Sequence, residues 1–273
     1  MHFLVDQFGW IPAGVLSALF IFLRYALMAG LGYAIFYVWQ RRAFLHRKIQ
    51  QKVPNWAIMR HEISHSLVSA AIFALVALGI YGMRLQGWSK VYWEVSDYPL
   101  WYLPLSFVFL VVLHDAYFYW MHRALHHPKL FRIFHRVHHQ SHNPTPWASL
   151  AFHPWEALAE IAILPILVLL VPFHPIALLA FASWSLIWNI IGHLGYELFP
   201  AGWVDHPIFK WINTSTHHNL NHKCGQGNYG LYFNWWDHWM GTNRPEYQER
   251  FRTITAGKQQ AKTSVLTSQQ DAA

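Results

Sequence analysis

The chain of 273 residues is 54% hydrophobic and 18% aromatic, and only 12% of its residues are charged, against roughly 25% in soluble domains. This composition excludes an ordinary water-soluble protein, although a mean hydropathy of +0.16 is too low for a bundle made only of membrane spans. The single cysteine, Cys224, excludes an intramolecular disulfide and a four-thiolate metal or iron–sulfur site. The net charge of +7 forms no long basic run, so we expect membrane topology and no nucleic-acid partner.

Several apolar stretches are long enough to cross a bilayer, which takes about 20 residues. No Lys or Arg lies between Met1 and Ile11, so we expect the first stretch to be a retained span and not part of a signal peptide. Arg24 within it should face protein or reach the membrane surface, because a charge facing lipid is costly. The last stretch is interrupted near Pro172 and Pro175, which predicts two full spans or a re-entrant pair. In chain order the stretches cover residues 12–39, 64–83, 99–121 and 155–192.

The uneven distribution of Lys and Arg between the loops predicts the orientation. Residues 40–60 are rich in them, whereas residues 84–98 carry Arg84 and Lys90 offset by Glu94 and Asp97. We therefore expect the N-terminus outside and the first connection in the cytoplasm. The expected architecture is all-α, an integral membrane bundle of about four transmembrane helices with a cytosolic, histidine-rich helical cap. The cap would cover residues 122–150 and 193–245 of a single domain, 1–253, followed by a disordered tail, 254–273.

The chain contains twenty histidines, and their spacing is more informative than their number. Histidines three or four residues apart share one face of a helix, and neutral imidazole binds iron, zinc, copper and nickel. One ion takes roughly four to six ligands, so eight or more convergent histidines predict two ions. Burying these groups without metal would cost about 1 to 3 kcal/mol for each unmatched donor or acceptor. The clusters are His122, His126 and His127; His135, His138 and His139; and His217, His218 and His222.

The surroundings of these clusters favour iron over zinc. Zinc has no accessible redox change and cannot activate dioxygen, and a catalytic zinc site combines three ligands with a carboxylate base, whereas acidic residues are sparse here. Attack on an unactivated C–H bond needs two metals that share the electrons for O₂ cleavage. Asp115 lies two helical turns before His122, and is either an acceptor that fixes an imidazole tautomer or a simple helix-end charge.

The clusters resemble the three histidine boxes of the sterol desaturase and fatty acid hydroxylase superfamily of membrane-bound di-iron oxygenases. They read His122-Arg-Ala-Leu-His126-His127, His135-Arg-Val-His138-His139 and His217-His218-Asn-Leu-Asn-His222. The resemblance extends over residues 60–245. Further matches are Asn143-Pro-Thr-Pro146, Phe152-His-Pro-Trp-Glu156, Gly192-His-Leu-Gly-Tyr-Glu197, Asn228-Tyr-Gly230 and Trp236-Asp-His-Trp-Met-Gly-Thr242.

The resemblance implies O₂-dependent hydroxylation or desaturation of a membrane lipid, a sterol or fatty acyl chain, at two non-haem Fe ions. Electrons would come from a separate reductase or electron-transfer protein. No catalytic residue is expected beyond the metal ligands, which are supported by Asp115, Asn221 and Asn228. The implied ligands are His122, His126, His127, His135, His138, His139, His193, His217, His218 and His222, with His114 as a further candidate.

One departure concerns the third box, which in the family often reads His-x-x-His-His. Asn221 stands where the first histidine of that pair would be. Three readings are open: His217 substitutes as a ligand, Asn221 itself binds weakly, or one iron is more open.

Two other classes of function compete. His61-Glu62-Ile-Ser-His65 fits the H-E-x-x-H pattern of an intramembrane zinc metallopeptidase, but this leaves the later clusters unexplained. A metal or proton transporter would use histidines as a relay, but here they crowd beyond the spans on one side. The tail carries no dilysine retrieval signal, which favours a bacterial inner membrane over the endoplasmic reticulum.

Overall fold

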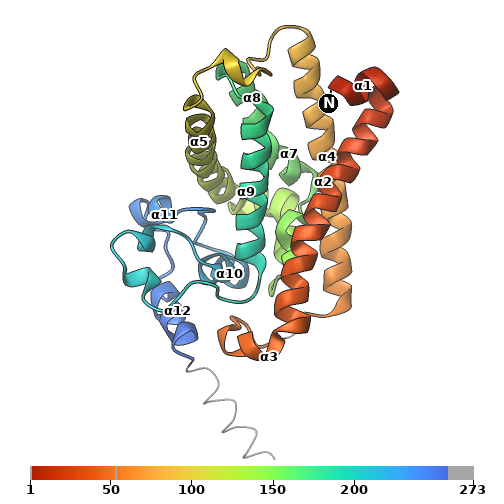
Figure 1. Ribbon diagram of the computed structural model, residues 1–273. Helices are drawn as coiled ribbons and strands as arrows, with labels where there is room; N and C mark the ends of the chain where they lie inside the picture. Colours follow the sequence, from red (N-terminus) through yellow and green to blue (C-terminus); the bar gives the residue numbers. More distant parts are fainter. Residues whose placement is uncertain (1, 53, 258–273) are drawn as a thin grey trace, which may run out of the picture.

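The computed structural model describes residues 2–52 and 54–257, and in this part of the chain it is helical without a named strand (Figure 1). The predicted all-α class is thus confirmed. Among the described residues, four helices are long and apolar enough to cross a membrane. They are α2 (Trp10–Tyr33) continued by the π-helical η1 (Ala34–Trp39), α4 (Trp56–Leu85), α5 (Tyr102–Leu125) and α9 (Pro175–His193).

These four helices turn large apolar side chains outward. Leu27 on α2 is 73% exposed and Leu75 on α4 is 66% exposed, and Val108 on α5 is exposed as well. A water-soluble protein rarely exposes contiguous apolar surface of this kind. The surface therefore suits contact with lipid, and the chain is a multi-pass membrane protein.

Two of the spans are longer than the hydropathy pattern predicts. Helix α4 begins at Trp56 because the Asn55 side chain accepts a hydrogen bond from the Ile58 N–H (2.9 Å) and caps the helix. Helix α5 continues to Leu125, so that His122 lies within its last turn. Both extensions are polar, which is why hydropathy alone ends the spans too early.

The apolar tract from 155 to 192 contains two short helices followed by one full-length helix. Helices α7 (Pro154–Ile161) and α8 (Ile163–Leu170) lead back toward the connection that follows α4, where the Lys90 N–H donates to the Val168 carbonyl (2.8 Å). His174 caps α9, and Pro175 occupies its first turn. The tract thus runs out and back, but only α9 has the length of a span (Figure 1).

Short helices connect the spans, and several of them, among them α10, α11 and α12, lie toward the C-terminal end of α9, whereas α1 lies at the other end of the bundle (Figure 1). The predicted tail lies outside the described residues apart from 254–257, of which the first two complete α12. The shorter elements are α1 (His2–Phe8), α3 (Arg41–Phe44), η2 (Leu45–Arg47), η3 (Val95–Asp97), α6 (Pro128–Leu130), η4 (Phe131–His135), η5 (His138–Gln140), η6 (Pro146–Leu150), η7 (Trp203–Asp205), η8 (Phe209–Trp211), α10 (Ser215–Cys224), α11 (Trp235–Trp239) and α12 (Tyr247–Thr255).

Two apolar clusters hold the frame around the histidines. In one, Phe118 of α5 packs with Val168 of α8 and Phe181 of α9. In the other, Tyr25 of α2 packs beside Leu150 of η6, and its hydroxyl donates to the Trp147 carbonyl (2.6 Å). The segment between the second histidine cluster and α7 is therefore fixed against the spans.

Candidate metal centre

Eight histidines form two groups of four, and within each group one ligand-capable atom per residue lies within 4.8 Å of the others. Seven of the eight are buried, and His126 is partly buried. The two groups are adjacent, because the rings of His139 and His222, one from each group, are stacked with centroids 4.5 Å apart. The first group is His122, His126, His135 and His139; the second group is His138, His193, His218 and His222.

Each element delivers its histidines for a local reason. His122 lies in the last turn of α5 and His126 is the C-cap residue of that helix, so the two are four residues apart on one face. Residues 131–140 form a π-helical turn and then a 3₁₀ turn, so the second cluster does not follow regular α-helical spacing. Helix α10 begins at the cap residue Thr214 and ends at Gly225, whose φ of 69° suits glycine. His218 and His222 therefore share one helix face.

Hydrogen bonds fix the tautomer of most of these imidazoles. A carbonyl or carboxylate oxygen can only accept, so the Nδ1 atom that faces it carries the proton and Nε2 carries the lone pair. This orientation is the one seen around protein metal ions. The acceptors are the carbonyls of Tyr229 for His122 (2.8 Å), Gly225 for His126 (2.9 Å), Ala151 for His138 (3.4 Å), Asn189 for His193 (2.6 Å) and Ser141 for His222 (3.1 Å), and the Glu156 carboxylate for His135 (2.5 Å).

The Nε2 atoms face one another at distances that fit a shared cation. For the four pairs that do not involve His218, the protons lie on Nδ1, so these are contacts between lone pairs, which repel unless something positive lies between them. Two nitrogens bound to one ion at about 2.1 Å and at right angles lie about 3.0 Å apart. The Nε2 separations are 3.1 Å for His122–His135, 3.2 Å for His122–His126, 3.1 Å for His138–His193, 3.2 Å for His193–His218 and 3.0 Å for His193–His222.

A proton is a poor substitute for that cation. Burial lowers the pKa of His126 to about 4. Burial, followed by the neighbouring histidines, lowers the pKa of His135, His138 and His222 well below the usual value. The imidazoles are therefore neutral at pH 7, and neutral imidazole is the form that binds metal.

Glu156 is a functional residue that the sequence reasoning missed. Its Oε1 lies 2.5 Å from His135 Nδ1, and both side chains are fully buried. The predicted supporting carboxylate, Asp115, is also buried, but it accepts from the N–H groups of Tyr232 (2.9 Å) and Phe233 (3.2 Å) and contacts no imidazole nitrogen of either group. Glu156 stood in the matched segment Phe152–Glu156, which was the one available signal.

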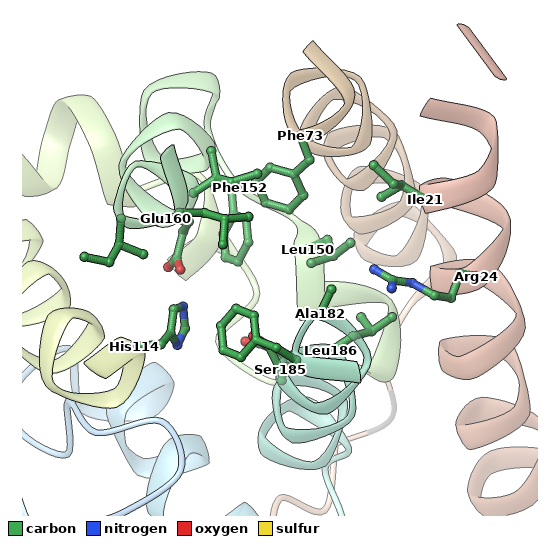
Figure 2. Close-up of a pocket in the computed structure, with 15 residues that line it drawn as sticks. Ile21, Arg24, Phe73, His114, Leu150, Phe152, Glu160, Ala182, Ser185 and Leu186 are labelled. Carbon is green, nitrogen blue, oxygen red and sulfur yellow. The ribbon is translucent and has the colours of Figure 1, made fainter. Parts of the chain in front are cut away.

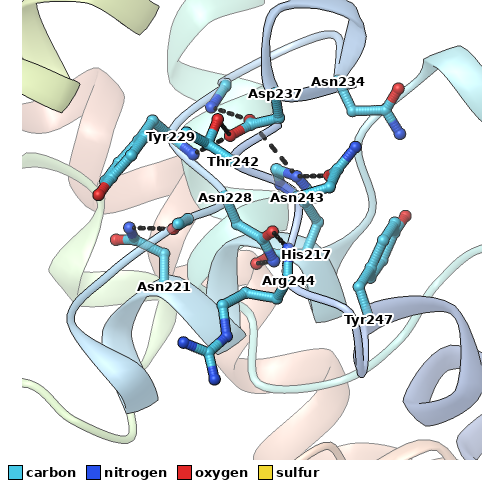
Figure 3. Close-up of polar contacts among 12 residues, drawn as sticks. His217, Asn221, Asn228, Tyr229, Asn234, Asp237, Thr242, Asn243, Arg244 and Tyr247 are labelled. Atoms are coloured by element: carbon cyan, nitrogen blue, oxygen red, sulfur yellow. Dashed lines mark hydrogen bonds and ion pairs between the residues drawn. The ribbon is translucent and has the colours of Figure 1, made fainter. Parts of the chain in front are cut away.

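Three predicted ligands lie outside both groups. His127 is exposed and caps α6, where its Nδ1 accepts from the Lys129 N–H (3.4 Å). His114 is buried about two helical turns before His122 on α5, and its Nδ1 lies 3.0 Å from the Tyr232 hydroxyl. His217 starts α10 on the face away from the second group, and its Nε2 lies 3.1 Å from Asn243 Oδ1 (Figure 3). His127 lies just beyond the end of α5 and His217 near the start of α10, whereas His114 lies inside α5.

Asn221 lies beside the first group. Its Nδ2 donates to the Gly227 carbonyl (2.8 Å) and lies 3.3 Å from His126 Nε2. Its Oδ1 is buried without a hydrogen-bond partner among the described residues. Of the two candidates to complete the third box, Asn221 is therefore the one next to a group, and His217 is not.

Asn228 and Asp237 organise the loop that orients His122 (Figure 3). Asp237 accepts from the backbone N–H groups of Tyr229 (2.9 Å) and Gly230 (2.7 Å), and the Tyr229 carbonyl faces His122 Nδ1. Asn228 has a φ of 57° and donates through Nδ2 to the His217 carbonyl (2.9 Å). Both side chains act through the backbone and touch no imidazole nitrogen of the two groups.

An apolar cavity of about 120 Å³ lies within the bundle beside the second group (Figure 2). Phe152 lines it, and the Phe152 ring lies 5.1 Å from the ring of His138. Asn189, whose carbonyl accepts from His193, lines it too. We call it the inner cavity. None of the eight histidines of the two groups lines this cavity, so Phe152 and Asn189 are its closest link to the second group.

The H-E-x-x-H pattern has a structural role. Both Glu62 oxygens face Thr145, one its hydroxyl and the other its N–H, so this carboxylate secures the loop before η6. His65 Nδ1 lies 3.0 Å from the His61 carbonyl in the same helix. In the described part of the chain neither histidine belongs to a metal-binding group, so the metallopeptidase reading is not favoured. Nor is the transporter reading, since both groups lie toward one end of the bundle.

Comparison with known proteins agrees with this geometry. The sequence model of the fatty acid hydroxylase family matches residues 107–242, a range that contains all eight histidines. No solved structure matches the chain.

Curated relatives have names that refer to sterol oxidation. The Delta(7)-sterol 5(6)-desaturase ERG3B of Gibberella zeae is 29% identical over 82% of this chain and 66% of its own length. Lathosterol oxidase of Rattus norvegicus is 32% identical over 64% of this chain and 58% of its own, and that of Homo sapiens is 29% identical over 66% and 59%. The chain thus spans about three fifths to two thirds of these relatives.

These fungal and mammalian proteins give no support to the bacterial membrane predicted from the tail. They do agree with the family match over the region that carries both histidine groups. The chain therefore belongs to the superfamily of sterol desaturases and fatty acid hydroxylases.

Proposed function

We propose that this protein oxidises a C–H bond of a membrane lipid with O₂, giving a hydroxylated or desaturated product, at two iron ions held by the two histidine groups. The observation that carries the proposal is the set of Nε2 atoms that face each other at 3.0 to 3.2 Å in the two groups. Iron rather than zinc is proposed because zinc offers no redox change.

The proposed ligands are the four members of each group. His139 supports this assignment, because its Nε2 is buried with no hydrogen-bond partner among the described residues. The iron pair would supply the oxidising chemistry with O₂ when bound. The backbone carbonyls and Glu156 would hold the imidazoles in place. Burial raises the pKa of Glu156, so the bound metal would be needed to keep it ionised, and in that form it would strengthen His135 as an electron donor to the metal.

The protein's other task is to present the lipid and exclude water. Phe152 and Leu186 line the inner cavity beside the second group, and Phe181 closes its side toward α5. A lipid carbon lying against Phe152 would be one side chain away from the His138 ring, whose centroid lies 5.1 Å from that of Phe152. Hydroxylation and desaturation would then differ by a small shift of the hydrocarbon along this wall.

Electrons are proposed to come from a separate protein that docks on the cytoplasmic side. Basic residues near α3, such as Arg41 and Arg42, lie at the end of the bundle where α10 and α12 are also found (Figure 1). An excess of Lys and Arg favours the cytoplasmic side of a membrane. We therefore assign the histidine-containing end to the cytoplasm.

The test combines metal analysis with lipid mass spectrometry. Purified protein, reconstituted anaerobically with ferrous iron, is expected to bind two equivalents, and His135→Ala and His193→Ala are each expected to lose iron from one group. With a chemical reductant and ¹⁸O₂, extracted membrane lipids should gain one oxygen atom or lose two hydrogens. Binding of less than one equivalent, or turnover untouched by both variants, would refute the proposal.

A further inference from the structure

Arg24 lies in the middle of a membrane span and lines two neighbouring apolar cavities. Beside the inner cavity lies a second cavity of about 350 Å³, the outer cavity, and Ile21, Arg24 and Phe73 line both. The outer cavity extends to Arg84 and Trp93 near the end of α4. In Figure 2 the Arg24 side chain reaches from α2 toward Ala182 and Leu186 of α9.

Among the described residues, none forms an ion pair with this guanidinium. Nη1 makes one long contact with Ser183 Oγ (3.4 Å), and Nε is buried without a hydrogen-bond partner. Glu160 also lines the inner cavity, but it lies across the chamber beside His114 (Figure 2), and no ion pair joins Glu160 to Arg24. A cation left unpaired at this depth is unfavourable, so a role in binding an anion would explain it.

We propose that Arg24 binds the carboxylate of an amphipathic lipid whose hydrocarbon chain runs through the inner cavity toward the second histidine group. The proposal rests on the proposed function and names its substrate class. A guanidinium offers a planar fork of donors that matches a carboxylate, and such charge-assisted pairs are the strong ones. A phospholipid head is the poorer fit. Arg24 lies fourteen residues into the span, about 20 Å along the helix, where a small carboxylate is more easily enclosed than a phosphate that carries glycerol and a second chain.

The depth of Arg24 also predicts which carbon is oxidised. Its contact Ser183 precedes His193 by ten residues on α9, which places the carboxylate about 15 Å along the helix from the second group. Phe152 lies at the end of the inner cavity that is nearest to the second group. The oxidised carbon should therefore lie deep in the hydrocarbon chain, and the carbon next to the carboxylate should not react.

The first experiment measures binding to the full-length, iron-loaded protein without O₂. Palmitate is expected to bind on the order of tenfold more tightly than hexadecanol, as a charge-assisted pair predicts. Arg24→Gln should abolish this preference and Arg24→Lys should retain part of it. The matched control is Arg60→Gln, an exposed arginine on α4 that lines neither cavity, and it should behave as wild type.

Several outcomes would overturn the assignment of Arg24. These are equal binding of palmitate and hexadecanol, a preference that survives in Arg24→Gln, a preference lost in Arg84→Gln alone, and tighter binding of dipalmitoyl phosphatidate than of palmitate. Folding of Arg24→Gln is checked by its melting temperature, which should be unchanged or higher because an unpaired cation is removed. If Arg24→Gln did not fold, Arg24→Lys would decide.

A second experiment separates this inference from the proposed function. Isotope-labelled palmitate is incubated with the iron-loaded protein, reductant and O₂, and the product is located by fragmentation. Oxidation far from the carboxyl group supports the inference, and oxidation at the adjacent carbon overturns it while leaving lipid oxidation intact. Palmitate that binds through Arg24 when no lipid is oxidised would instead refute the proposed function alone.

Discussion

Glu156 distinguishes the two histidine groups at the level of single residues. In the described part of the chain, the first group has a carboxylate behind one imidazole, whereas the second group is oriented through backbone carbonyls. A carboxylate makes the imidazole that it faces a stronger donor to a metal. The two sites should therefore differ in affinity, although each has four histidines.

Glu156→Gln should weaken iron binding at the first group by about 10- to 100-fold, the usual effect of losing such a partner. The amide can still accept from His135 Nδ1, so the loss would come from the missing charge. Ferrous or cobaltous titration of purified protein gives the two affinities. Glu160→Gln, one turn later on α7, is the control and should bind normally. Two unchanged affinities in Glu156→Gln would contradict the role.

Asn221 should make the two metal sites spectroscopically different. Its Nδ2 is 3.3 Å from His126 Nε2, so a histidine there would add an imidazole beside the first group. We expect two distinct ⁵⁷Fe Mössbauer doublets in the wild type. In Asn221→His the first-group doublet should shift and the affinity there should rise. Asn219→His is the control, because Asn219 faces Gln50 instead. A spectrum that stays the same in Asn221→His would count against this position.

At the scale of elements, the packing of α9 on α10 depends on the absence of a side chain at Gly192. A Cβ built there would lie 3.0 Å from Cδ2 and 3.2 Å from Cγ of His218. The ring of His218 is itself constrained, because its Nε2 faces His193. Neither helix can move away without displacing a member of the second group.

Gly192→Ala should therefore destabilise the protein by about 1 to 3 kcal/mol through overpacking, and should lower metal affinity at the second group. Gly79→Ala on α4 is the matched control. No atom lies within 4 Å of its added Cβ, and alanine in a helix is favoured over glycine by about 0.5 to 1 kcal/mol. Denaturation and metal titration of both variants would check this. Equal stabilities would show that α10 adjusts freely.

The helical spacing of histidines predicted their convergence but not their partition. His135, His138 and His139 were expected on one helix face, yet His135 and His139 join the first group and His138 the second. The reason is local, because this segment is a π turn followed by a 3₁₀ turn, which no hydropathy pattern signals. By contrast, His218 and His222 lie on a regular helix and stay together, as predicted.

The sequence alone could not predict which distant segments contact each other. Glu156 is 21 residues from His135, and nothing in the spacing links the two. His127 matched a family box but lies just beyond α5, where it caps α6. The spans themselves were predictable, because their length and apolar content are properties of contiguous residues.

Over the whole molecule, the two groups join α5, the turns from 131 to 140, α9 and α10. Helices α2 and α4 carry no member of either group. Each of them packs more extensively against the other than against any other element. Without a cation, the facing Nε2 lone pairs would push these segments apart. Metal should therefore stabilise one half of the fold more than the other.

Removal of iron by an anaerobic chelator should lower the melting temperature, since a ligand present at a thousandfold excess over its Kd stabilises the bound state by about 4 kcal/mol. Hydrogen–deuterium exchange should accelerate in α10 and in residues 131–140, because their packing depends on the groups. Exchange in α2 and α4 should stay the same and serves as the internal control. Ferrous iron should restore protection, whereas magnesium, which prefers oxygen ligands, should not. Uniform acceleration along the chain, or none, would show that the histidine groups do not hold these segments together.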